Sequence, residues 1–188
     1  MTKKVNDNEN NKRIADITGI PASVGTSETE YPTDSKPLDM DQKVKVYSIA
    51  GWTTSFKRLE SIGDAMITPS GFITLTRSEI ISQVNSGNRL FTGLDNLGGH
   101  ATLFIDDAPT RVEVGFDAPD ENRVQNVLNS DKVKQLFDHK GIASFEKALK
   151  ELVVTRAEKY AIIEIIKKSK INDFEKIRIV ENYTGFRL

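Results

Sequence analysis

The chain has 188 residues, enough for one sizeable domain or two small ones. Its 27 acidic and 26 basic residues nearly cancel, so net charge gives no reason to expect the whole molecule to bind nucleic acid or an acidic membrane. It contains no cysteine, which excludes a disulfide scaffold and thiolate metal sites, and its apolar runs are too short to span a bilayer. We therefore expect a cytoplasmic protein with no membrane partner.

Residues 1–42 are predicted to form a flexible polar arm, because their composition offers too little apolar surface to offset chain entropy. Within this arm Ile14, Ile17 and Ile20 recur every third residue, so a short helix would place them on one side. The spacing is either a coincidence in a tail or a partner-binding motif. We retain these three residues as candidate partner-binding residues.

Residues 43–117 are predicted to form an α+β sheet domain. Valines alternate with lysines from residue 43, which is typical of a half-buried strand that runs to about residue 50. A short helix is then expected, because Phe56, Leu59 and Ile62 follow one another at threefold spacing before a glycine.

Residues 65–87 contain the clearest local signals in the chain. Two short apolar runs, 65–68 and 72–75, flank a proline–serine–glycine turn, which predicts a β-hairpin. Thr76 and Glu79 then have the spacing of a capping box, so a helix should begin at the next residue after Thr76 and end at Gly87.

The rest of the predicted sheet follows a glycine-rich stretch. Residues 88–99 favour a brief strand and a mobile loop. Residues 101–105 and 112–116 alternate between apolar and polar side chains around an Asp-Asp-Ala-Pro turn, which predicts a second hairpin. The expected fold is therefore α+β, with an antiparallel or mixed sheet of five to six strands and two short helices.

Residues 118–188 are predicted to form a helical C-terminal segment, because the apolar period changes from two to about 3.6 near Asp117. Thr155 with Glu158 has capping-box spacing, and Gly185 can end the last helix. The expected helices cover residues 119–128, 131–139, 145–154, 156–168 and 173–183.

A metal-assisted hydrolase would need several carboxylates or histidines close together. The candidates are His100, Asp95, Asp106, Asp107 and Glu113. On the predicted strand His100 and Asp106 lie too far apart to share an ion, at about 3.3 Å per residue. We therefore assign no catalytic residue, no metal ligand and no cofactor, and an uncharacterised hydrolase is the second alternative function.

A nucleic-acid-binding regulator is the first alternative. The basic residues Lys167, Lys168, Lys170 and Arg178 lie in two predicted helices that are joined by a short turn, in the outline of a helix-turn-helix. The second helix begins with acidic residues, however, which would repel phosphate groups. The same lysines are also explained as favourable charges at a helix C-terminus.

The leading prediction is a non-enzymatic binding protein that acts through another protein or as a homo-oligomer. It depends on the arm and on the absence of a recognisable catalytic motif, and no motif points to a known family. A small chain of this kind is typical of the accessory or inhibitor proteins of phages and plasmids.

Overall fold

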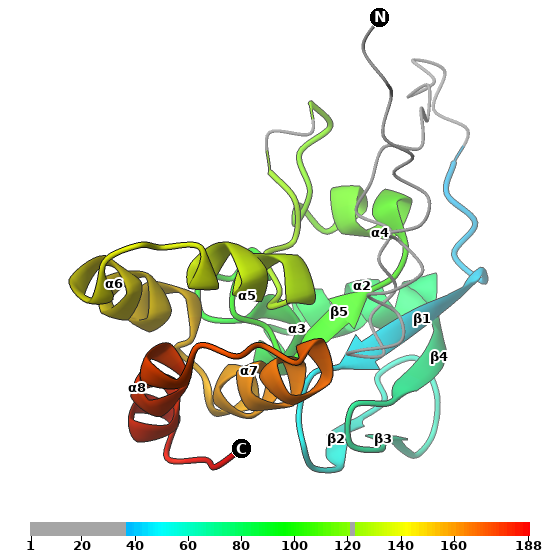
Figure 1. Cartoon of the computed structure of the whole chain (residues 1–188). Coiled ribbons are helices and arrows are strands. Elements are labelled where there is room, and N and C mark those ends of the chain that lie inside the picture. Colours follow the sequence, from blue (N-terminus) through cyan, green and yellow to red (C-terminus); the bar gives the residue numbers. More distant parts are fainter. Residues whose placement is uncertain (1–36, 121–122) are drawn as a thin grey trace, which may run out of the picture.

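The structure is a computed structural model that describes residues 37–120 and 123–188 (Figure 1). This part of the chain is α+β, as predicted, and contains five strands and seven helices. Most of the predicted arm lies outside the described residues. The strands are β1 (Lys43–Ser48), β2 (Thr54–Lys57), β3 (Asp64–Ile67), β4 (Phe72–Thr76) and β5 (Leu103–Ile105).

The strands belong to two antiparallel sheets, so the prediction of a single sheet of five to six strands is wrong. One sheet has the order β4-β1-β5, and β2 pairs only with β3. In the first sheet Val46 of β1 lies opposite Ile73 on one side and Ile105 on the other. The alternation of valine and lysine in β1 thus places Val44 and Val46 in a buried core.

Strand β5 lies between two hydrophobic clusters because successive side chains point to opposite faces of a strand. Leu103 and Ile105 belong to a cluster formed with β1, β3 and β4, whereas Phe104 belongs to a second cluster formed with the C-terminal helices. All three β5 residues are buried. Both faces of this strand are therefore covered, one by each half of the molecule.

The helix predicted around Phe56, Leu59 and Ile62 is replaced by strands β2 and β3. Their register pairs Thr54 with Ile67, and both side chains are buried. Leu59 and Ile62 lie in the connection between the two strands and are exposed. The threefold spacing was therefore coincidental, and burial of alternate residues decided the local structure.

The first predicted hairpin is also wrong, although its turn is correct. The amide of Gly71 donates a hydrogen bond to the carbonyl oxygen of Thr68 at 2.9 Å, but β3 and β4 pair with different strands. The following helix, α2 (Arg77–Asn85), is confirmed: the Thr76 hydroxyl accepts from the amide of Glu79. The carboxylate of Glu79 does not complete the capping box but accepts from the backbone amides of residues 59 and 60.

Two short helices occupy places where strands were predicted. Helix α3 (Arg89–Thr92) replaces the brief strand after residue 87. Helix α4 (Ala108–Glu113) replaces the second strand of the second hairpin, with Asp107 as its N-cap. The Asp107 side chain accepts from the amide of Thr110, and Pro109 lies in the first turn, where its missing N–H costs nothing.

Four of the five predicted C-terminal helices are confirmed within one to three residues at each end, and Figure 1 shows them grouped beside the strands. The helix predicted over 119–128 is wrong, because the described residues of that range contain none. The helices are α5 (Ser130–Phe137), α6 (Ile142–Leu152), α7 (Arg156–Ser169) and α8 (Phe174–Thr184).

The ends of these helices follow from local chemistry. The Thr155–Glu158 capping box is present in full at the start of α7, and Gly185 ends α8 in the left-handed conformation, with φ 76°. Helix α7 buries Ile162, Ile163 and four further apolar residues and packs against both α5 and α8. Within the described residues no helix is both long and apolar enough to cross a membrane.

Candidate functional site

A fixed loop follows α3 and positions His100. The carboxylate of Asp95 accepts from the amides of Leu97 and Gly99, and a Cβ at Gly99 would lie 2.3 Å from that carboxylate. A side chain at residue 99 would therefore displace the Asp95 carboxylate from its contacts. The loop delivers His100 in the left-handed region, with φ 58°, which is uncommon for a residue other than glycine.

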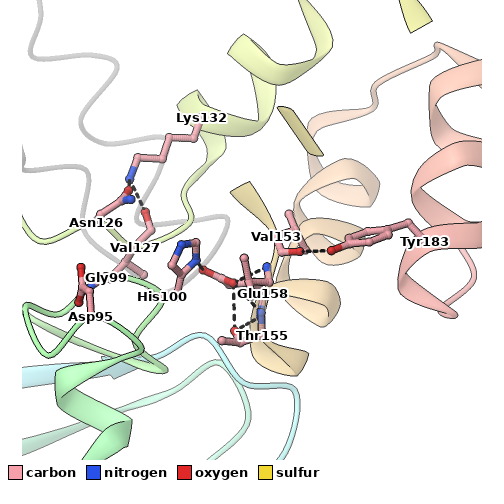
Figure 2. Close-up of polar contacts among 11 residues, drawn as sticks. Asp95, Gly99, His100, Asn126, Val127, Lys132, Val153, Thr155, Glu158 and Tyr183 are labelled. Carbon is pink, nitrogen blue, oxygen red and sulfur yellow. Dashed lines mark hydrogen bonds and ion pairs between the residues drawn. The ribbon is translucent and has the colours of Figure 1, made fainter. Parts of the chain in front are cut away.

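The imidazole of His100 contacts Glu158, in the first turn of α7, at 2.8 Å (Figure 2). An ionised carboxylate has no hydrogen to donate, so Nδ1 of His100 is the donor. The second carboxylate oxygen of Glu158 accepts from the amides of Val154 and Thr155 and from the Thr155 hydroxyl. Both oxygens of this buried carboxylate thus have donors.

Lys132 of α5 lies near the His100–Glu158 pair (Figure 2). Its ammonium donates to the side-chain oxygen of Asn126 and to the carbonyl oxygen of Val127. Burial lowers the pKa of Lys132, and the carboxylate of Glu158 acts in the opposite direction. A groove of about 320 Å³ adjoins this lysine and is also lined by His139 and by residues of α5 and α6.

We interpret His100, Glu158 and Lys132 as a structural junction. The His100–Glu158 contact joins two distant segments, whereas Lys132 holds the residues just before its own helix. A second contact between distant segments lies nearby: the Tyr183 hydroxyl donates to the Val153 carbonyl oxygen at 2.7 Å (Figure 2). The junction fixes the loop before β5 to the start of α7.

Two of the residues considered for a hydrolase, Asp95 and Asp107, hold local structure. Asp95 closes its own loop, and Asp107 caps α4 and pairs with Arg77 at 3.0 Å. Asp106 is partly buried; burial raises its pKa, while Arg111 and a nearby lysine oppose this change. Across the described residues, no three His, Cys, Asp or Glu side chains are grouped as metal ligands.

A second site lies at the other end of α7. An open groove of about 520 Å³ runs between the end of α7, the turn after it and α8. The apolar side chains on its surface are Ile166, Ile171, Phe174, Ile177 and Leu188. Phe174 is 81% exposed and Leu188 is 42% exposed, so this apolar surface faces water.

Basic side chains surround this apolar surface, which we call the α7–α8 groove. Lys167, Lys170 and Arg178 line it, and Glu181 is its one acidic lining residue. The carboxylate of Glu181 accepts hydrogen bonds from the amide of Leu188 and from the guanidinium of Arg187, the latter at 3.2 Å. These two contacts lower the pKa of Glu181, whereas desolvation acts in the opposite direction. Among residues 37–120 and 123–188, Lys170 and Arg178 have no ion-pair partner, whereas Lys167 pairs with Glu164 in an exposed contact.

The structure thus brings together three of the four basic residues chosen from the sequence. Lys168 is exposed on α7 but is not among the residues that line the groove. The candidate partner-binding residues Ile14, Ile17 and Ile20 lie outside the described residues.

Sequence reasoning missed the apolar half of the groove and the His100–Glu158 pair. Phe174 begins α8 and Leu188 lies beyond its end, so no local sequence pattern relates the two residues. The glycines before His100 were a signal for a turn that carries positive φ, and they were interpreted only as mobility. Comparison with known protein families, with curated proteins and with solved structures finds no match for this chain.

Proposed function

We propose that this chain is a non-enzymatic binding protein that docks an acidic, apolar segment of a protein partner in the α7–α8 groove. The observation that carries the proposal is an exposed apolar surface with a basic rim at one place on the molecule. Burying an exposed aromatic side chain of this size supplies most of the free energy of a small interface. The basic rim of the groove attracts acidic segments and fixes the orientation in which they bind.

The apolar lining favours a peptide over a nucleic acid. Isoleucine and leucine side chains match aliphatic partners, whereas single-stranded nucleic acid is usually bound by stacking on several aromatic rings. Helix α8 also begins with Asp173 and Glu175, at the helix end where phosphate groups would otherwise bind. Lys176, in the same turn, is buried and donates to the carbonyl oxygen of Phe137.

The test is a selection of displayed random peptides against the full chain, followed by affinity measurements on the enriched peptides. We expect the enriched sequences to combine Asp or Glu with Ile, Leu or Phe. Phe174→Ser should weaken their binding at least about tenfold, and Ile62→Ser, which changes an equally exposed apolar residue on the β2–β3 connection, should leave binding unchanged.

Charge provides the second part of the test. The double variant Lys170→Glu/Arg178→Glu should lose binding, and the affinity of the native chain should fall as salt is added. Lys147→Glu/Lys150→Glu on α6 is the matched control, because both lysines are exposed. Enrichment without acidic residues, or binding insensitive to Phe174→Ser, would contradict the proposal. So would a gel shift of single-stranded DNA or RNA that depends on Lys170 and Arg178 while no peptide binds.

A further inference from the structure

The sequence itself contains a segment with the chemistry that the α7–α8 groove favours. Residues 14–35 include the apolar series Ile14, Ile17 and Ile20 and contain neither lysine nor arginine. Their acidic residues are Asp16, Glu28, Glu30 and Asp34. This stretch therefore combines three isoleucines with charges of negative sign alone, which complements the exposed Phe174 and the basic rim of the groove.

We infer, on the basis of the proposed function, that residues 14–35 of the same chain occupy the groove and compete with the partner for it. The isoleucines cover the apolar surface, and the acidic residues face Lys167, Lys170 and Arg178. The chain would then carry its own inhibitor, and a partner binds fully only when it displaces this segment.

The connecting chain is long enough for this contact. Sixteen residues, 21–36, separate Ile20 from Pro37, the first described residue. At about 3.3–3.6 Å per residue they can span roughly 55 Å. A compact domain of this size has a radius of gyration of about 15 Å, so the extended connection is longer than the diameter of the domain.

Covalent connection makes even a weak contact effective. A short flexible tether whose root-mean-square length matches the span gives an effective concentration of the order of 1 mM. A segment with a dissociation constant of about 0.1 mM would then fill its own groove roughly nine-tenths of the time. The apparent affinity for any external ligand of the groove would fall about tenfold.

The test uses the full chain and, as the probe, a fluorescent synthetic peptide with the sequence of residues 10–36. We compare the native chain with Ile14→Ser/Ile17→Ser/Ile20→Ser. The peptide should bind this triple variant about tenfold more tightly than it binds the native chain, because the groove of the variant is empty. Adding Phe174→Ser to the triple variant should abolish binding. A control, Val5→Ser, which lies outside residues 14–35, should behave as the native chain does.

Each other outcome overturns the inference in a distinguishable way. If the peptide does not bind the triple variant, residues 14–35 are not a ligand of the groove, and the displayed-peptide selection still decides the proposed function. Equal affinity for both proteins would show that the native groove is free. If sedimentation shows a native dimer that the triple substitution dissociates, the segment binds a second copy instead of its own chain.

Discussion

The imidazole of His100 and the carboxylate of Glu158 join two parts of the chain that are 58 residues apart, through a contact of 2.8 Å. His100 belongs to the loop before β5, and Glu158 to the first turn of α7. The groove that we propose as the binding site lies at the opposite end of the same helix. The pair therefore helps to hold α7 against the strands, together with the hydrophobic cluster that α7 shares with Phe104 of β5.

His100→Ala should destabilise the protein by about 1–3 kcal/mol, because it leaves one oxygen of the buried Glu158 carboxylate without a donor. His100→Asn should recover part of the loss, since asparagine tolerates positive φ and its amide can donate. Urea unfolding measures both changes. His139→Ala, at an exposed position, is the control and should stay within about 0.5 kcal/mol of the native chain. Equal effects of the two alanine substitutions would contradict a structural role for the junction.

Glu79 should make stability depend on pH. Burial alone would raise its pKa, but donors from Gln83 and from the amides of Leu59 and Glu60 outweigh burial, so the pKa in the folded state lies below the ordinary value of 4.5. A depressed carboxyl pKa means that the unfolded state binds more protons as the pH falls. The stabilisation is therefore complete above about pH 4.5 and is lost as the pH falls through the folded-state pKa.

Glu79→Gln tests this dependence. The variant should be about 1–3 kcal/mol less stable than the native chain at pH 7, because an amide cannot accept all of the donors that converge on the carboxylate. The difference should shrink as the pH is lowered below 4.5 and through the folded-state pKa of Glu79, because the native carboxyl then also takes up a proton. Denaturant unfolding over this pH range checks the prediction. Glu113→Gln, at an exposed position, should show no such change, and a constant difference at all pH values would exclude Glu79 as the cause.

Local signals predicted the elements whose ends depend on neighbouring residues. The capping box of α7, the hydroxyl cap of α2 and Gly185 after α8 all involve contacts within a few residues, so the sequence displays them directly. The α+β class and four C-terminal helices were predictable for the same reason. The basic side of the groove was also predictable, because Lys167 and Lys170 lie in one short stretch.

Helices and strands that depend on contacts with residues far along the chain could not be predicted from local sequence patterns. Residues 112–116 alternate between apolar and polar side chains as a strand would. The Asp107 cap and Pro109 nevertheless begin a helix, α4, that includes Val112. Among the described residues no strand pairs with the outer edge of β5; instead the side chain of Gln125 donates to Leu103 O and accepts from Ile105 N. No periodicity in residues 101–105 indicates that a glutamine 20 residues later takes the place of a strand.

Arg77 should be coupled energetically to Asp107. The guanidinium is buried and donates to Asp107, Thr110, Gln42 and the Asp39 carbonyl oxygen. Arg77→Met should cost about 3–5 kcal/mol, because it leaves a partly buried carboxylate without its counter-charge. The double variant with Asp107→Asn should be less destabilised than the two single changes added together, by about 0.5–3 kcal/mol. Additive effects in urea unfolding would contradict the coupling, and Arg89→Met at an exposed position is the control.

Lys170→Gly should separate binding from folding. Lys170 follows α7 with φ 51° and ψ 41°, a left-handed conformation that costs a lysine about 1–2 kcal/mol and a glycine nothing. Glycine loses more conformational freedom on folding, so the net gain in stability should be about 0.5–1 kcal/mol. The same change removes one cation from the rim of the α7–α8 groove and should weaken binding of acidic peptides several-fold. Lys134→Gly within α5 is the matched control, because it removes an exposed lysine from a right-handed helix and should lower stability without changing binding. A more stable Lys170→Gly protein that binds selected peptides as tightly as the native chain would place their site away from the groove.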